Sequence, residues 1–221
     1  MNKTFLRIIL SKNRLMPYLI KISLGLVRQH LWMIFFIIQA CNSSTLPPGE
    51  YITWIRTHQA LLTNSQVYGD VCTTLNYLPA DWLAVKEAGS DNPEQIAAAQ
   101  KEYEGLEYYR LRIATVSGQG DVLQYGIELT EDYYRRVEYF SFGFQKDLRL
   151  LVDQDTLPCK LFHFERNYGA APYMDFMLGF EQKIGLISNR TLIYEDFVFS
   201  NNIVKLTIPA ENIQKLPILT L

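Results

Sequence analysis

The side chains best suited to chemistry lie within one short segment, Leu157 to Arg166 (LPCKLFHFER). Alternation along an extended strand places Cys159, His163 and Glu165 on one face, because successive side chains point to opposite sides. His163 and Glu165 are two positions apart, so their Cα atoms lie about 6.5–7 Å apart, which suits a hydrogen bond, an ion pair or two ligands of one metal. Cys159 lies about 13 Å along the strand from His163, too far to join the same coordination sphere.

Two interpretations of His163 and Glu165 follow from this spacing. In the favoured one they form a structural pair within a sheet; in the other they are catalytic residues of a hydrolase. The chain has no Gly-x-Ser-x-Gly motif, and a Cys–His pair of Cys159 with His58 would require the fold to bring the two together. Since the chain also lacks Cys-x-x-Cys and His-x-x-x-His, we expect neither a metal site nor a cofactor.

The elements around this segment indicate the fold class. Apolar periodicity and capping residues predict helices at 51–63, 79–88, from Pro93 to near Gly105, and at 131–140. Alternation and turn residues predict strands at 66–78, 106–116, 122–129, 148–152, 157–165, 173–180, 191–197 and 203–208. We therefore expect one α+β domain with an antiparallel sheet of roughly six to eight strands and a few short helices, mostly in the N-terminal half.

Aromatic residues crowd the middle of the chain. They are Tyr103, Tyr108, Tyr109, Tyr125, Tyr133, Tyr134, Tyr139, Phe140, Phe142 and Phe144. Aromatic side chains serve cores first, so we expect most of them to be buried. An exposed subset would form a binding face for a protein, a glycan or a lipid.

Charge is distributed unevenly along the chain. Residues 1–40 carry six Lys or Arg and no acidic residue, although the formal net charge of the whole chain is −2. The remaining 181 residues thus hold 15 basic and 23 acidic side chains, a net charge of −8. Nucleic-acid binding relies on Lys and Arg at phosphates, so we expect no nucleic-acid partner.

The basic N-terminal residues precede an uncharged apolar run at 31–38, which is followed by Gln39, Ala40 and Cys41. Spanning a bilayer takes about 20 apolar residues, so this shorter run is typical of a signal peptide, here 1–40, or 16–40 if translation starts at Met16. An uncleaved anchoring helix is the alternative. The polar, breaker-rich residues 41–49 would then form a tether to a domain at 50–221.

The segment Ile38-Gln39-Ala40-Cys41 resembles the bacterial lipobox, in which a small residue precedes the Cys that becomes lipidated. The resemblance implies that Cys41 anchors the chain to a membrane of the bacterial cell envelope. Surface-directed lipoproteins of some lineages carry an acidic tract after this Cys. The first acidic residue here is Glu50, which favours an anchor that faces the periplasm.

Two further covalent features are testable. Export would permit a disulfide between Cys72 and Cys159, but Cys72 shares its strand face with polar residues and Cys159 with apolar ones, which disfavours the bond. The triplet Asp155-Thr156-Leu157 resembles a short bacterial O-glycosylation sequon and is predicted to lie near the tip of a hairpin, where modifying enzymes have access.

The body also resembles uncharacterised bacterial envelope lipoproteins in three segments, Tyr51-Ile-Thr-Trp-Ile, Tyr77-Leu-Pro and Cys159 to Tyr168. This resemblance implies no activity. We expect a membrane-anchored binding or assembly factor without catalysis. The alternative is an envelope hydrolase whose site includes His163 and Glu165.

Overall fold

The structure is a computed structural model, and it describes residues 44–221. The predicted signal peptide at 1–40 and the predicted lipidation of Cys41 lie outside the described residues. Residues 44–221 belong to one compact unit. Within this range, no helix combines the length and the apolar character that crossing a bilayer requires.

An eight-stranded antiparallel sheet dominates the described part of the chain, which confirms the α+β class. Its strands follow the order β2-β3-β4-β7-β6-β5-β8-β9. The strands are β2 (Thr63–Tyr68), β3 (Val71–Leu78), β4 (Leu106–Thr115), β5 (Arg149–Val152), β6 (Asp155–Glu165), β7 (Tyr173–Glu181), β8 (Arg190–Asp196) and β9 (Asn202–Ile208). A separate parallel pair joins β1 (Thr45–Leu46) to β10 (Ile218–Leu219).

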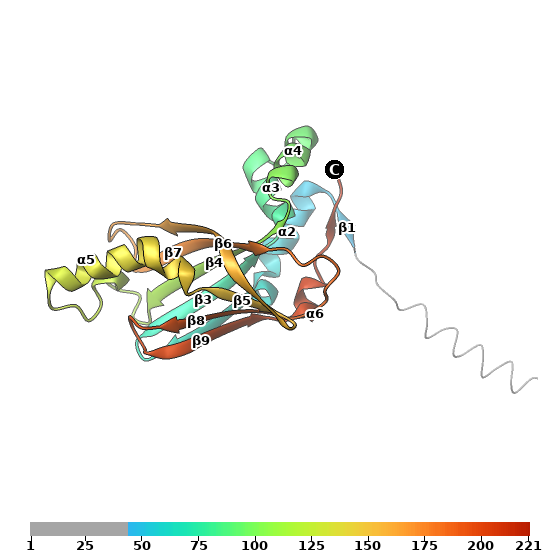
Figure 1. The fold of residues 1–221 in the computed structure, drawn as a ribbon. Helices are drawn as coiled ribbons and strands as arrows, with labels where there is room; N and C mark the ends of the chain where they lie inside the picture. Colours follow the sequence, from blue (N-terminus) through green and yellow to red (C-terminus); the bar gives the residue numbers. More distant parts are fainter. Residues whose placement is uncertain (1–43) are drawn as a thin grey trace, which may run out of the picture. The chain divides into compact units, whose positions relative to one another are not determined.

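The sheet curls until its two edge strands approach each other, so it is nearly a barrel (Figure 1). The Tyr68 hydroxyl of β2 donates to the Ile203 carbonyl of β9 at 3.4 Å. One strand further in, the Thr73 and Tyr194 hydroxyls lie 3.4 Å apart. The interior is filled by side chains such as Leu111 and Phe176, which are completely buried. The barrel thus has one apolar core and an outer face that is partly open to solvent.

Five short helices accompany the sheet in the described residues: α2 (Pro48–Thr57), α3 (Ala80–Ala88), α4 (Pro93–Glu102), α5 (Thr130–Glu138) and α6 (Ala210–Ile213). The first three lie in the N-terminal half, whereas α5 and α6 lie later in the chain. The predicted start of α4 is confirmed, since the Asn92 side chain accepts a hydrogen bond from the Gln95 amide at 3.1 Å. Pro93, at the first helical position, loses no bond because that amide has no intrahelical partner.

Two predicted strands differ from the structure. The segment 66–78 is not one strand but the hairpin β2–β3, because Gly69 adopts φ 58 and reverses the chain. The segment 122–129 is not a strand; it begins with a 3-10 turn at Val122–Gln124. There the Asp121 side chain accepts from the Leu123 amide at 2.9 Å, which caps the turn and competes with extended backbone.

The folded domain begins earlier than predicted, before Glu50. Thr45 and Leu46 form β1, and α2 starts at Pro48. The Ile218 amide donates to the Ser44 carbonyl at 2.9 Å, so the C-terminal strand holds this segment in place. Residues 45–49 of the predicted tether therefore belong to the folded domain.

The charged side chains of α5 make two kinds of contact. Asp132 pairs with Arg135 at 3.5 Å on the exposed face. Arg136 instead donates to the carbonyls of Leu123 at 3.0 Å and Tyr125 at 2.8 Å. Arg136 thus fastens α5 to the preceding loop.

Candidate functional site

A β-bulge in β6 changes which side chains share a face. Cys159 pairs with Phe180 of β7, and the next paired residue is Leu161, opposite Gly179, so Lys160 is the extra residue. A Cβ atom at Gly179 would lie 2.9 Å from the Leu161 Cβ, so this crossing requires glycine. Beyond the bulge the alternation is shifted by one residue, as a register slip requires.

The predicted common face of Cys159, His163 and Glu165 is therefore wrong. Cys159 is buried in the barrel core, whereas His163 and Glu165 are exposed on the outer face. The core-facing residues after the bulge are Phe162 and Phe164, both of which pack against Phe176. No hydrogen bond or ion pair joins His163 to Glu165 in the described chain, so the predicted structural pair is also absent.

His163 and Glu165 instead line an outer groove, a hollow of about 520 Å³ at the end of β6 and β7. The groove is lined by His163, Phe164, Glu165, Arg166, Asn167, Tyr168, Tyr173 and Asp175. Glu165 stands directly opposite Asp175 in the ladder between β6 and β7. The sheet thus brings two carboxylates and an imidazole to one concave surface, which sequence spacing alone did not predict for Asp175.

The Asp175 carboxylate is fully engaged within the protein. Arg112 of β4 donates to it through Nε at 2.7 Å and Nη2 at 2.6 Å, a bidentate pair. The hydrogen bonds from Arg112 to Asp175 raise the pKa of the Arg112 guanidinium. The Tyr173 ring covers this guanidinium at 3.6 Å from its centroid. Asp175 is therefore committed to Arg112, and Glu165 is the carboxylate of the groove that is free to meet a ligand.

The loop between β6 and β7 displays a tyrosine at the edge of the outer groove. Tyr168 is 79% exposed and adopts φ 53, a backbone conformation that bulky residues rarely take. Asn167 stabilises the loop, since its side-chain oxygen accepts from the Gly169 amide at 3.1 Å and its amide group donates to the Tyr173 carbonyl. Arg166 lies over the Tyr168 ring at 4.7 Å. The hydrogen bonds of Asn167 thus fix the loop in a conformation that exposes the Tyr168 ring to solvent.

The groove offers acid–base groups and hydrogen-bonding groups, but its lining contains no Ser, Thr, Cys or Lys that could act as a nucleophile. Within residues 44–221, no set of three or more His, Cys, Asp or Glu side chains is arranged to hold a metal ion. No protein-family model, curated protein or solved structure matches the chain.

The predicted alternative of a Cys159–His58 pair is wrong. His58 is exposed at the C-terminal end of α2, where its ring stacks on Trp54 with centroids 4.2 Å apart. Cys159 lies inside the barrel, and burial raises the pKa of its thiol to about 11. A protonated, buried thiol is a poor nucleophile.

The two cysteines of the described chain are free and lie on opposite faces of the sheet. Cys72 of β3 is partly exposed and lies next to Thr74 on the outer face, whereas Cys159 points into the core. Two strands, β4 and β7, separate β3 from β6 in the sheet order. This placement leaves the Cys72–Cys159 disulfide, which the sequence disfavoured, unformed. Thr156 is exposed in β6, just past the turn, and its modification stays a prediction.

Seven of the ten crowded aromatic residues contribute to apolar clusters, but only four of them are buried: Tyr108, Tyr109, Phe140 and Phe144. Tyr103, Tyr133 and Tyr139 are partly buried against those clusters. Phe140 and Phe144 are buried with ring centroids 5.3 Å apart, and Phe144 also meets Tyr194 edge-on at 5.1 Å. Tyr134 of α5 and Phe142 remain 64% and 78% exposed. Only part of the aromatic group therefore fills the barrel, and Tyr125, Tyr134 and Phe142 are exposed.

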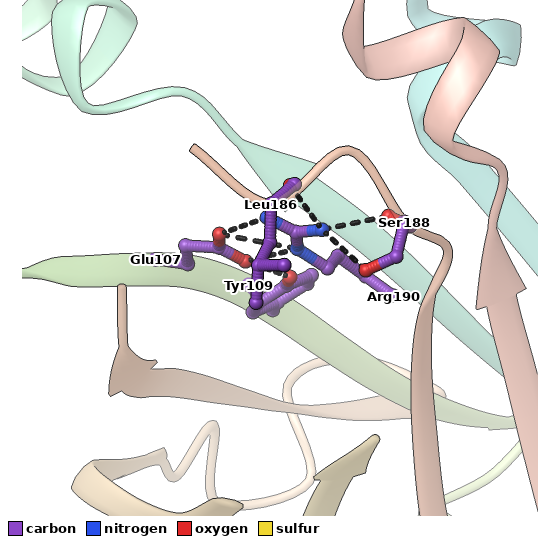
Figure 2. A network of polar contacts seen from close by, with 5 residues as sticks. All are labelled: Glu107, Tyr109, Leu186, Ser188 and Arg190. Carbon is purple, nitrogen blue, oxygen red and sulfur yellow. Dashed lines mark hydrogen bonds and ion pairs between the residues drawn. The ribbon is translucent and has the colours of Figure 1, made fainter. Parts of the chain in front are cut away.

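A buried ion pair closes one end of the barrel, and sequence analysis did not predict it. Arg190 donates to Glu107 through Nη2 at 2.7 Å and through Nε, while the Tyr109 hydroxyl donates to the same carboxylate at 2.9 Å (Figure 2). The guanidinium also donates to the carbonyls of Leu186 at 3.3 Å and Ser188 at 2.6 Å. Burial and the nearby Glu107 charge raise the pKa of Tyr109 well above its usual value.

Strand alternation puts Glu107 of β4 and Arg190 of β8 at positions that face the core. This alternation is the one sequence feature that could have indicated that the two charged residues are buried. A buried charged side chain requires a partner of opposite charge. Here that partner lies 83 positions away in the sequence, so strand alternation does not identify it. Each side-chain nitrogen of Arg190 and both carboxylate oxygens of Glu107 form hydrogen bonds within the protein. We therefore assign it a structural role and assign the ligand site to the outer groove.

Proposed function

We propose that this chain is a bacterial envelope lipoprotein, anchored through a lipid on Cys41 and facing the periplasm, whose barrel domain binds a saccharide in the outer groove. The observation that supports this function is the composition of the groove. It combines an exposed tyrosine ring with hydrogen-bonding side chains of both signs, and its charges are balanced within the site.

A saccharide presents hydroxyl groups that both donate and accept hydrogen bonds, along with apolar C–H faces. The Glu165 carboxylate accepts hydrogen bonds, and the His163 imidazole offers one donor and one acceptor when neutral. The exposed Tyr168 ring supplies a flat apolar surface for a sugar face, with a polar hydroxyl at its end. Sites for small polar ligands combine these groups in a concave surface.

Charge balance argues against a strongly ionic ligand. The Asp175 carboxylate is neutralised by Arg112 at 2.6 Å. The remaining charged side chains of the groove, Glu165 and Arg166, carry opposite signs. A neutral, hydroxyl-rich ligand meets this arrangement without leaving an uncompensated charge.

A hydrolase remains the second candidate function, because the groove contains His163, Glu165 and a second carboxylate. In that case Glu165 or His163 would activate a water molecule as a general base. The engagement of Asp175 by Arg112 opposes this alternative, since both oxygens of that carboxylate already accept hydrogen bonds from the guanidinium. Binding without turnover is therefore the function that the geometry favours.

The experiment screens the purified protein against an array of bacterial envelope oligosaccharides and measures the affinity of each hit by calorimetry. Tyr168→Ala and Glu165→Gln should each weaken binding by about tenfold or more, because each removes a directly contacting group. Tyr134→Ala is the matched control: this tyrosine is 64% exposed but lies on α5, outside the groove lining. Absence of any bound saccharide, or equal affinity of all three variants, overturns the proposed function.

The oligosaccharides that bind in this screen also serve to distinguish binding from hydrolysis. Prolonged incubation followed by mass analysis of the oligosaccharide should show no cleavage. Cleavage that is lost in Glu165→Gln while binding is retained would establish the hydrolase instead.

A further inference from the structure

The loop between β7 and β8, residues 182–189, exposes an unusual run of apolar side chains. Ile184 is 89% exposed, Ile187 is 73% exposed and Leu186 is 42% exposed. Single exposed apolar residues are ordinary on protein surfaces, but three within four positions form a local apolar tip. The segment 184–189 carries no charged residue.

Polar contacts hold this loop at both ends. Its first amide, that of Gln182, donates to the Gly105 carbonyl at 3.0 Å, and Lys183 pairs with Asp155 at 3.0 Å. The buried Arg190 guanidinium donates to carbonyls inside the loop, at Leu186 and Ser188 (Figure 2). The backbone of the loop is thus fastened to the barrel while the isoleucine side chains face solvent.

The loop lies at the end of the barrel where the chain enters the fold. The Ala210 amide of α6 donates to the Asn189 side chain at 2.9 Å, which fixes the loop beside α6. The chain then runs from α6 into β10, which pairs with β1 directly after Ser44. Figure 1 shows α6, β1 and the C-terminus at one end of the molecule.

Chain length limits how far this end lies from the proposed lipid anchor. Only three residue steps separate Cys41 from Ser44. At about 3.3–3.6 Å for each fully extended residue, the two lie within about 11 Å of each other. A lipid on Cys41 would therefore hold the β1 end of the barrel close to the membrane surface.

We propose that the 182–189 loop inserts Ile184, Leu186 and Ile187 into the interface of the membrane that holds Cys41, so that the domain rests on the bilayer in one orientation. This inference depends on the lipid anchor of the proposed function and not on the saccharide groove. The body of the chain is acidic, with a net charge of −8 over residues 41–221, so the contact depends on apolar insertion and not on attraction to anionic lipid.

The test places a polarity-sensitive fluorophore on Ile184→Cys in the lipidated, full-length protein, after reconstitution into phosphatidylcholine vesicles. Cys72→Ser removes the accessible native thiol, while Cys159 is buried and its raised pKa keeps it unreactive. The matched control is Val67→Cys, since Val67 is also β-branched and 59% exposed but lies next to the turn at the opposite end of the barrel. Brominated phospholipids then report contact with acyl chains.

We expect a blue-shifted emission at position 184 and quenching at least about threefold stronger than at position 67, as insertion to the acyl boundary requires. Water-like emission at both positions on vesicle-bound protein overturns the loop contact alone and leaves the anchor intact. Emission at 184 that is blue-shifted but not quenched by brominated lipid shows that protein covers the loop, which also overturns the proposal. Wild-type protein that does not stay with the vesicles overturns both the anchor and the loop contact.

Discussion

Arg190, at the start of β8, reaches Glu107, at the start of β4, and donates two hydrogen bonds of 2.9 Å or less to its carboxylate. The two strands are not neighbours in the sheet, so the ion pair joins them through the barrel interior. Both side chains are buried. One interaction thereby ties together two parts of the sheet and the loop at 182–189.

Glu107→Gln should lower the free energy of unfolding by about 3–5 kcal/mol, because it leaves a buried guanidinium without its counter-charge. Chemical denaturation measures the change. The control is Asp132→Asn, which breaks the exposed pair with Arg135 and should change stability by less than about 0.5 kcal/mol. A loss at Glu107 no larger than that at Asp132 would show that the buried pair is not formed.

The bulge in β6 predicts opposite outcomes for two neighbouring residues. Phe164→Ala should lower the free energy of unfolding by about 2–3 kcal/mol, because Phe164 stacks on Phe176 at 4.9 Å. His163→Ala should change it by less than about 0.5 kcal/mol, since His163 is exposed. Thermal and denaturant unfolding of both variants measure these changes in the free energy of unfolding. A larger loss at His163 than at Phe164 would mean that the strand keeps its regular alternation.

Because of Cys159, the free energy of unfolding should fall as the pH rises through the alkaline range. Burial raises its pKa from 9.0 to about 11, so between these values the unfolded chain loses the thiol proton first. The unfolded state then binds fewer protons, and stability falls as pH rises. The contribution of the protonated Cys159 thiol to the free energy of unfolding is fully present below pH 9 and amounts to about 2–3 kcal/mol. Cys159→Ala should reduce the fall in the free energy of unfolding between pH 9 and 10, below the usual pKa of the buried tyrosines, whereas Cys72→Ala should leave that fall unchanged.

Thiol counting tests the positions of the two cysteines. Under denaturing, non-reducing conditions Cys72 and Cys159 should give two free thiols, because they face opposite sides of the sheet. In the native protein only Cys72 should react quickly. A denatured count of zero would require a bond that this arrangement of strands does not allow.

Lipidation of Cys41 is tested by expression in a bacterial host. The wild type should partition into detergent and begin at a lipid-modified Cys41, while Cys41→Ser should lose the lipid mass. Two acyl chains anchor a protein stably, whereas one binds marginally, at about 0.8 kcal/mol for each buried methylene. Wild-type protein in the aqueous phase, or protein that retains residues 1–40, would support the uncleaved anchoring helix.

Local chemistry determined much of this fold from the sequence alone. Asn92 and Pro93 start α4 because capping and the fixed φ of proline act within one turn. The turn between β5 and β6, the strand at 173–181 and the pairing of β8 with β9 follow from alternation and turn residues, which also act over short distances. The burial of Phe140 and Phe144 followed from their apolar area.

Only the tertiary structure decided which faces those strands present. The bulge at Lys160 depends on Gly179, a residue of the neighbouring strand, because only a residue without a Cβ lets Leu161 cross there. That contact turned His163 and Glu165 outward and placed them beside Asp175. The pairing of Arg190 with Glu107 likewise joins residues 83 positions apart. Periodicity reports only which side of a strand a residue occupies, whereas the site depends on which strands meet, and non-local packing decides that.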